Sequence, residues 1–256
     1  MKVSDIISAL ETVAPLSLQE DYDNCGLLVG DPDMECTGAL LTVDVTPEIA
    51  REAIDSGLNL IVAHHPLIFR GLKRLGGSTL VEQSVIMAVK ADIAIYACHT
   101  CLDNAPGGVS FRMASMLGLD EVSALDPDSG SGAVGILAQS MSADELVDVV
   151  KATFGSPVAR CSGYPMDERI TRVAMCGGSG AFLIGRALDA GAQAFITSDT
   201  KYHDFVDYAG RILIIDIGHH ESENCTKDIF YHVIKEKFPI FAVRYAKSDI
   251  NPIKYL

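Results

Sequence analysis

The sequence predicts an α/β fold in which a mostly parallel or mixed sheet is covered by helices. Apolar runs of strand length alternate with helical segments from residue 39 onward, as in repeated strand–helix–strand units. The second part of the chain also echoes the first. At 256 residues and 48% hydrophobic content, the chain is long enough for one large domain or two small ones.

The first elements carry clear start and stop signals. A helix is expected over residues 3–14, because Ser4 can cap its N-terminus and Pro15 ends it. Thr46 and Pro47 open the next helix as its cap and its first-turn proline. The other elements expected in this part are strands at 39–45, 58–63 and 93–98, a helix at 79–91 and a short apolar run within 22–30.

Two segments of the first part align without gaps with two segments of the second. Residues 53–65 match residues 187–199 at an offset of 134, and residues 93–103 match residues 213–223 at an offset of 120. Repeated βαβ patterns can produce such matches by accident. Two matches in the same order nevertheless favour an internal duplication.

The segment 126–132 is rich in Ser, Gly and Asp and is expected to be a linker or hinge. The predicted halves are therefore residues 1–125 and residues 126–256, each an αβ unit. Beyond this segment, Ser142 and Glu145 have capping-box spacing, which predicts the start of a helix.

The charge balance is acidic, since 34 Asp and Glu residues against 20 Lys and Arg residues give a net charge of −14. Nucleic acid and anionic membrane surfaces are not expected partners, because both require a cationic face. The start of the chain has no apolar region typical of a signal peptide, and no run of 18 apolar residues occurs. Seven scattered cysteines favour free thiols in a reducing compartment. These features predict a cytoplasmic protein that does not cross a membrane.

Adjacent histidines follow the strand expected at residues 58–63. Neighbouring side chains of a regular strand face opposite sides, so His64 and His65 can serve one site only where the strand has ended. Pro66 provides that ending. The alternative interpretation is a solvated histidine pair in a surface loop.

Two further pairs share a pattern, because His99 with Asp103 and His219 with Glu223 each stand four residues apart after a strand. On a helical turn this spacing puts both side chains on one face, within reach of one cation. Taken separately, Asp103 could be a turn residue, and Glu223 could answer a helix dipole. Without His99, the three clusters supply three histidines and two carboxylates, which exceed one tetrahedral zinc site and indicate two metal ions. The candidate ligands are His64, His65, Asp103, His219 and Glu223.

These motifs resemble those of a known family. The histidine pair with Pro66, residues 99–103 and residues 216–223 are similar to signature blocks of the NIF-three-like dinuclear metal proteins, also called GTP cyclohydrolase I type 2 homologs. Residues 23–30 and 197–204 match further blocks. The resemblance spans nearly the whole chain, and several spaced motifs in the right order are far more specific than any single one.

The resemblance implies two similar, intertwined αβ halves and a dinuclear centre held by the five candidate ligands. It also implies a homohexamer shaped as a toroid, with the metal sites facing its interior. At this length the chain is similar to the short form of the family, which lacks an inserted domain. Two details depart from the pattern: Cys101 stands where asparagine is common, and His220 adds a histidine beside His219.

Two other histidines, His99 and His203, are candidate catalytic residues. Each could orient a ligand, transfer a proton or simply pack, as groups around metal ligands do. Cys98 and Cys101 have the spacing of a redox pair, but no helix N-terminus that would lower a thiol pKa is predicted there. The glycine-rich segment 177–180 could cradle a phosphate, although a tight turn is the favoured interpretation.

The function favoured by these residues is a metal-dependent hydrolase with two divalent metal ions per subunit, zinc, iron or manganese. Such ions orient an oxygen-containing substrate and activate water. The expected substrate is a small molecule, a nucleotide or another phosphorylated compound, and the family label points to GTP ring opening. The alternative is a non-catalytic metal-binding ring protein that contacts a protein or nucleic-acid partner.

Overall fold

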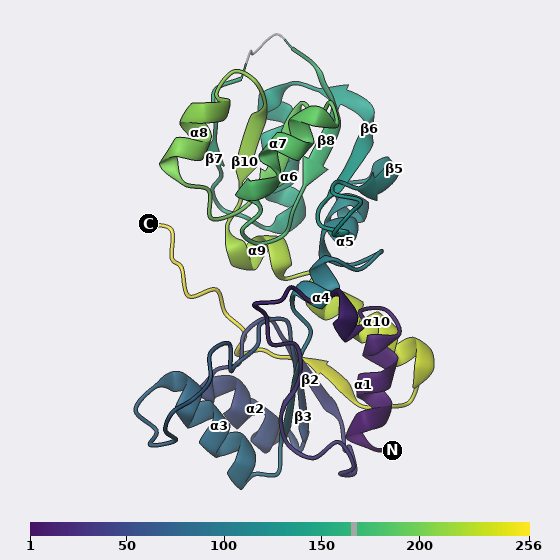
Figure 1. Cartoon of the computed structure of the whole chain (residues 1–256), viewed down its shortest axis with the longest axis vertical. Helices are drawn as coiled ribbons and strands as arrows, with labels where there is room; N and C mark the ends of the chain where they lie inside the picture. The colour runs from purple at the N-terminus through teal and green to yellow at the C-terminus, as the bar shows by residue number, and fades with distance from the viewer. Residues whose placement is uncertain (165–167) are drawn as a thin grey trace. The chain divides into compact units, whose positions relative to one another are not determined.

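The computed structural model describes residues 1–164 and 168–256, and these form two mixed α/β units (Figure 1). The first unit contains Met1–Leu102 and Thr226–Ile250, and the second contains Asp103–Cys225 and Asn251–Leu256. The chain therefore leaves the first unit, builds the second and returns. The predicted α/β class, with two mixed sheets covered by helices, is confirmed.

The first unit has a five-stranded sheet in the order β1-β4-β3-β2-β11. Its strands are β1 (Gly26–Val29), β2 (Ala39–Thr42), β3 (Leu60–Ala63), β4 (Ala94–Ala97) and β11 (Val243–Tyr245). β11, β2, β3 and β4 are parallel, and only β1 runs antiparallel, beside β4. In register, Ala63 pairs with both Thr42 and Ala97, so the three central strands end at the same edge.

Helices cover both faces of this sheet, with α2 and α3 on one side and α1 and α10 on the other (Figure 1). Their bounds are α1 (Val3–Glu11), α2 (Pro47–Ser56), α3 (Leu80–Lys90) and α10 (Thr226–Lys237), and α4 (Thr100–Asp103) follows β4. Thr46 caps α2, as predicted, and Gly57 ends it in the left-handed conformation. The cap of α1 is Lys2 instead of Ser4, because the Asp5 carboxylate accepts a hydrogen bond from the Lys2 amide and starts the helix earlier.

The second unit has a six-stranded sheet in the order β5-β6-β8-β9-β10-β7. Its strands are β5 (Leu119–Ala124), β6 (Ala133–Met141), β7 (Arg160–Cys161), β8 (Ile170–Met175), β9 (Ala194–Thr197) and β10 (Leu213–Asp216). β8, β9 and β10 are parallel, and the other pairings are antiparallel. The helices are α5 (Val109–Met116), α6 (Ala143–Phe154), α7 (Ile184–Asp189), α8 (Tyr202–Tyr208) and α9 (His219–Glu223). Short 3₁₀ turns lie at Leu16–Leu18 in the first unit and Ala181–Leu183 in the second.

The segment 126–132 is not a linker between units. It connects β5 and β6 as a hairpin, closed by backbone hydrogen bonds from Asp126 to Ser131 and from Gly130 to Asp126. Its Ser, Gly and Asp content reflects turn chemistry, which a linker shares. The predicted halves 1–125 and 126–256 therefore stay a prediction from the repeat, whereas the compact units have other bounds because α10 and β11 pack with the first sheet.

Polar residues follow the parallel strands of both sheets, as the sequence predicted for strand ends. In the first unit they come after β2, β3 and β4, and in the second after β9 and β10, whereas a glycine-rich turn follows β8. Within the described residues, no helix combines the length and the apolar character that a membrane crossing requires.

Candidate metal centre

Three histidines converge at the carboxyl edge of the first sheet. His64 and His65 follow β3, and His99 follows β4, two residues after its last residue. Each ring offers a nitrogen within 4.8 Å of the others, and the ring centroids lie 5.0 to 5.3 Å apart. We call His64, His65 and His99 the histidine cluster. The adjacent pair can face one site because β3 has ended at Ala63, as predicted.

The proton position on His64 follows from its partner. His64 is fully buried, and its Nδ1 lies 2.9 Å from the carbonyl oxygen of Cys98. A carbonyl only accepts hydrogen bonds, so Nδ1 carries a proton. In the neutral ring, Nε2 then presents a lone pair, which is the form that binds a metal ion.

In the other two histidines, a carboxylate lies within hydrogen-bond distance of the same ring nitrogen, Nδ1. His65 Nδ1 lies 2.9 Å from Asp44 Oδ1, and His99 Nδ1 lies 2.9 Å from Asp23 Oδ1. A carboxylate on one ring nitrogen fixes the ring orientation, selects the tautomer and makes the other nitrogen a stronger ligand. All three rings are therefore held through Nδ1, which makes Nε2 the nitrogen that would bind a metal ion.

Asp23 is held as an anion. Burial raises the pKa of Asp23, but hydrogen bonds from His99, Thr100 and Cys25 outweigh this effect and hold the pKa well below its ordinary value. Thr100 contributes both its amide and its hydroxyl group. The side chain of Asp23 is fully covered, so it is a fixed support for His99.

No sequence pattern indicated a role for Asp23 or Asp44. Asp23 lies within a family-like block, next to Asn24, where it resembles an ordinary turn residue. Asp44 stands two residues beyond β2, as His65 stands two residues beyond β3. Equivalent positions after neighbouring parallel strands are the signal that could have identified Asp44.

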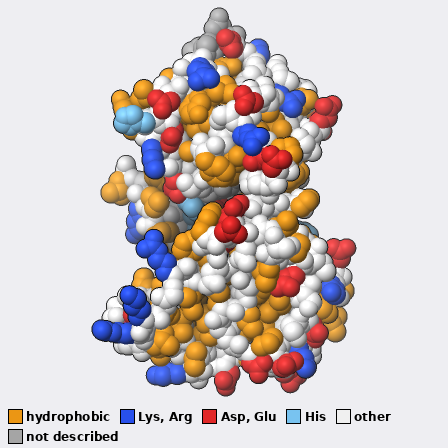
Figure 2. Space-filling model, in the orientation of Figure 1, with side chains coloured by type: hydrophobic (Ala, Val, Ile, Leu, Met, Phe, Trp, Pro, Cys, Tyr) orange, Lys and Arg blue, Asp and Glu red, His pale blue; other side chains and the backbone are white. Residues whose placement is uncertain are grey.

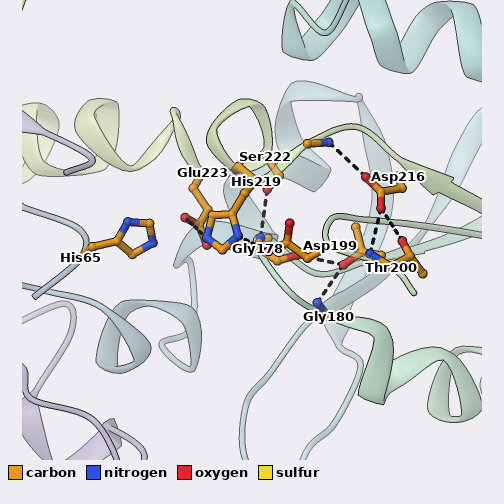
Figure 3. Close-up of polar contacts among 12 residues, drawn as sticks. His65, Gly178, Gly180, Asp199, Thr200, Asp216, His219, Ser222 and Glu223 are labelled. Carbon is orange, nitrogen blue, oxygen red and sulfur yellow. Dashed lines mark hydrogen bonds and ion pairs between the residues drawn. The ribbon is translucent and has the colours of Figure 1, made fainter. Parts of the chain in front are cut away.

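A second group of candidate ligands lies in the second unit, at the two ends of the short helix α9 (Figure 3). His219 Nε2 lies 3.0 Å from Glu223 Oε2, which confirms that the spacing of four residues places both on one face. His219 Nδ1 lies 2.7 Å from Asp199 Oδ2, the same arrangement as in the histidine cluster. Two ligands of a tetrahedral zinc ion stand about 3.3 Å apart for bonds of about 2.0 Å. His219 and Glu223 are close to that spacing.

Glu223 is 3% exposed, and the glycine-rich turn after β8 leaves room for it. A Cβ atom on Gly178 would lie 2.2 Å from Glu223 Oε1 and 3.4 Å from His219 Cε1. The Gly178 amide donates to Ser222 Oγ at 2.9 Å, and Ser222 Oγ donates to the His219 carbonyl at 2.8 Å (Figure 3). The segment 177–180 is therefore a tight turn, as favoured, and its close approach shapes the position of Glu223.

The loop after β9 is tied to the end of β10. Asp216 Oδ2 accepts hydrogen bonds from the Thr200 amide at 2.8 Å and its hydroxyl group at 2.6 Å (Figure 3). Arg160 also forms an ion pair with Asp216. Asp199, just before Thr200, has a φ of 54°, a left-handed conformation that aspartate tolerates better than most residues. These contacts fix Asp199 as the partner of His219.

Asp103 also belongs to the second unit. Burial raises the pKa of the Cys176 thiol, and the negative charges of Asp103 and Glu223 raise it further. The two carboxylates thus lie near the same buried thiol. The predicted ligands fall into two sets, with His64 and His65 in the first unit and Asp103, His219 and Glu223 in the second.

The two candidate catalytic histidines have different surroundings. His99 is part of the histidine cluster. His203 is exposed on α8, where its ring contacts Tyr202 at 5.4 Å between centroids. The additional His220 lies on α9, beside His219.

A family model described as Duf34/NIF3 (NGG1p interacting factor 3) matches residues 1–253 of the chain. The chain belongs to the Duf34/NIF3 family. The resemblance drawn from the sequence motifs is confirmed.

Relatives of this NIF3-family chain carry the name "GTP cyclohydrolase 1 type 2 homolog". The relative from Clostridium perfringens is 38% identical over 229 residues, which cover 87% of each chain. The relative from Lactococcus lactis is 37% identical over 223 residues, covering 86% of each chain.

Solved structures of the family have the same fold. Hypothetical protein SA1388 of Staphylococcus aureus superposes with a TM-score of 0.91 at 28% identity, covering 100% of this chain and 99% of that chain. A Bacillus cereus protein related to NIF3 gives a TM-score of 0.90 at 22% identity, with the same coverage.

Proposed function

We propose that this NIF3-family protein is a metal-dependent hydrolase of a phosphorylated small molecule, such as a nucleotide. Its centre would hold two divalent cations with His64, His65, Asp103, His219 and Glu223. The observation that supports this proposal best is that a protein oxygen lies within hydrogen-bond distance of Nδ1 in each of these histidines. The oxygen belongs to a backbone carbonyl for His64 and to a carboxylate for His65 and His219. Histidines oriented in this way are typical of metal ligands.

The donor set indicates which cations fit. Imidazole nitrogens suit zinc, iron and other borderline divalent ions, whereas calcium and magnesium prefer sites built from oxygen alone. A set of three imidazoles and two carboxylates therefore fits zinc, iron or manganese, two ions per subunit.

When bound, such cations polarise a phosphoryl oxygen and lower the pKa of water. The other steps belong to the chain itself. Asp44 and Asp199 keep His65 and His219 in one orientation through their Nδ1 atoms. His99 is held by Asp23 in the same way, so its Nε2 atom can take up or release a proton beside the substrate. A catalytic role for His203 stays a prediction.

The proposal also includes an assembly state and a cellular compartment. The family resemblance suggests a homohexamer, and the seven cysteines are all free thiols, which suits the reducing cytoplasm.

The test begins with metal analysis of natively purified protein, followed by an anaerobic screen of nucleotides and phosphate esters with the metal found. Glu223→Gln should lower both metal content and turnover, because an amide is a weaker ligand than a carboxylate. Glu236→Gln is the matched control, since Glu236 is exposed on α10. Full metal content in Glu223→Gln would show that the ligand set is wrong. Bound metal without any turnover would favour the non-catalytic alternative.

A further inference from the structure

A long irregular segment follows the adjacent histidines. Residues 64–79 connect β3 to α3 without regular secondary structure. Within it, residues 69–75 are all exposed, and we call them the cationic loop. Structureless connections beyond about 12–15 residues are uncommon in compact domains and usually serve a function.

The charge of this loop is opposite to that of the protein. Arg70, Lys73 and Arg74 lie within five residues, and no acidic residue occurs from residue 56 to residue 81. In the part of the chain that the structure describes, no ion pair engages these three side chains. Figure 2 shows several Lys and Arg side chains on the left of the lower part of the view. Three unneutralised cations therefore stand together on a protein of net charge −14.

Both ends of the loop are fixed. On one side, the Asn24 side-chain amide donates to the Ile68 carbonyl at 2.5 Å. On the other, the Glu82 carboxylate accepts from the amides of Gly76 at 2.9 Å and Ser78 at 3.0 Å. These contacts leave the cationic loop projecting between two anchors, so its cations stay in one region of the unit.

The start of the loop contacts the histidine cluster. The ring of Phe69 lies edge-on to the ring of His99, with 6.3 Å between centroids, and 6.5 Å from the ring of Tyr22. Arg70 directly follows Phe69. The cationic loop therefore begins beside the histidine cluster of the same unit.

We propose that Arg70, Lys73 and Arg74 bind the phosphate groups of the substrate while its reacting group lies at the histidine cluster. This inference rests on the proposed function and assigns recognition to residues outside the metal ligands. Arginine forms paired hydrogen bonds with phosphate oxygens, and lysine adds a point charge. A cationic patch on an acidic protein also steers a multiply charged anion to that patch.

The same phosphate chemistry occurs on lipid headgroups, and the exposed Leu72 and Leu75 could contact a bilayer. A soluble anion is the favoured source for two reasons. A net charge of −14 repels an anionic membrane, and the loop is anchored beside the histidine cluster.

The test measures binding of inorganic triphosphate by calorimetry, with metal-loaded and with chelator-treated protein. The variant combines Arg70→Ala, Lys73→Ala and Arg74→Ala. Its control combines Arg51→Ala, Lys90→Ala and Lys237→Ala, which remove the same charge from exposed helix positions of the same unit. We expect the loop variant to bind roughly tenfold more weakly, as three partly exposed ion pairs imply, with unchanged metal content. The control should bind like the wild type.

Equal binding by the loop variant and its control would overturn the inference. So would binding of the wild type to vesicles containing phosphatidic acid but not to soluble triphosphate. Failure of the proposed function has a separate signature, namely wild-type protein without bound metal or turnover. Triphosphate binding by the chelator-treated protein would still test the cationic loop, because that binding does not involve a metal ion.

Discussion

The substitution Gly178→Ala tests whether the glycine-rich turn confines Glu223. Gly178 has a φ of 62°, and its added Cβ would lie 2.2 Å from Glu223 Oε1 and 3.2 Å from Glu223 Cδ. Because Glu223 is 3% exposed, its carboxylate cannot simply swing into solvent. The substitution should therefore push the carboxylate away from His219.

The magnitude has two parts. An alanine in the left-handed conformation costs about 1–2 kcal/mol of folding free energy at any position. The clash of the added Cβ with the buried Glu223 carboxylate adds the cost of overpacking, about 1–3 kcal/mol. Gly178→Ala should thus lower the free energy of unfolding by about 2–5 kcal/mol. Metal affinity should fall by about 10- to 100-fold or more, the range seen when metal ligands lose their support.

Gly155→Ala separates these two parts. Gly155 ends α6 with a φ of 66°, and a Cβ there would meet no atom within 4 Å. This control has the same backbone strain without the clash, so it should lose about 1–2 kcal/mol and no metal affinity. Urea denaturation and metal competition with a chelator measure both quantities. Indistinguishable losses in the two variants would refute the confinement of Glu223 by Gly178.

Three other outcomes are expected. Asp199→Asn should weaken metal binding about 10-fold or more with little change in the urea midpoint. The reason is that a neutral amide supports His219 less than the half-exposed carboxylate does. Unchanged metal affinity would contradict this role of Asp199. The Asp23 carboxylate stabilises the fold above its ordinary pKa of 3.8, and this stabilisation is lost as the pH falls through the depressed pKa of the folded state. Asp23→Asn should therefore lower the free energy of unfolding at neutral pH by about 1–3 kcal/mol. It should also make the stability of the protein depend less steeply on pH on the acid side. An acid limb identical to the wild type would contradict it. A hexamer of the 27.4 kDa chain should sediment near 164 kDa, and a monomer at micromolar concentration would exclude the ring.

The parallel strands and the residues at their ends could be predicted from sequence because both depend on local pattern. Strands β2, β3 and β4 are short, fully buried apolar runs bounded by turn signals. The contact between His219 and Glu223 follows from helical spacing alone. Local rules sufficed wherever one element determined the geometry.

Partnerships between distant segments could not be predicted in the same way. Asp23 and His99 are 76 residues apart, and their contact exists because β1 pairs antiparallel with β4. The segment 126–132 was misread for a related reason, since turn residues look alike in a hairpin and in a linker. The composition of this segment predicts that the chain turns there. Only the pairing of β5 with β6 shows that the turn joins two strands of one sheet and not two units.

The charges of the proposed centre explain why a separate cationic loop would matter. In the proposed centre, two divalent cations would bring four positive charges, which Asp103 and Glu223 as ligands would reduce to two. The carboxylates of Asp23, Asp44 and Asp199 lie behind the histidines and add three negative charges, so the proposed centre with these carboxylates would carry a net charge of about −1. Such a centre would orient a phosphoryl oxygen at contact distance, but its net negative charge would not attract an anion from beyond a Debye length of about 8 Å. Three unneutralised cations on the cationic loop would make the local charge positive. The loop would then attract the anion from a distance, and the residues of the centre would act on it at contact.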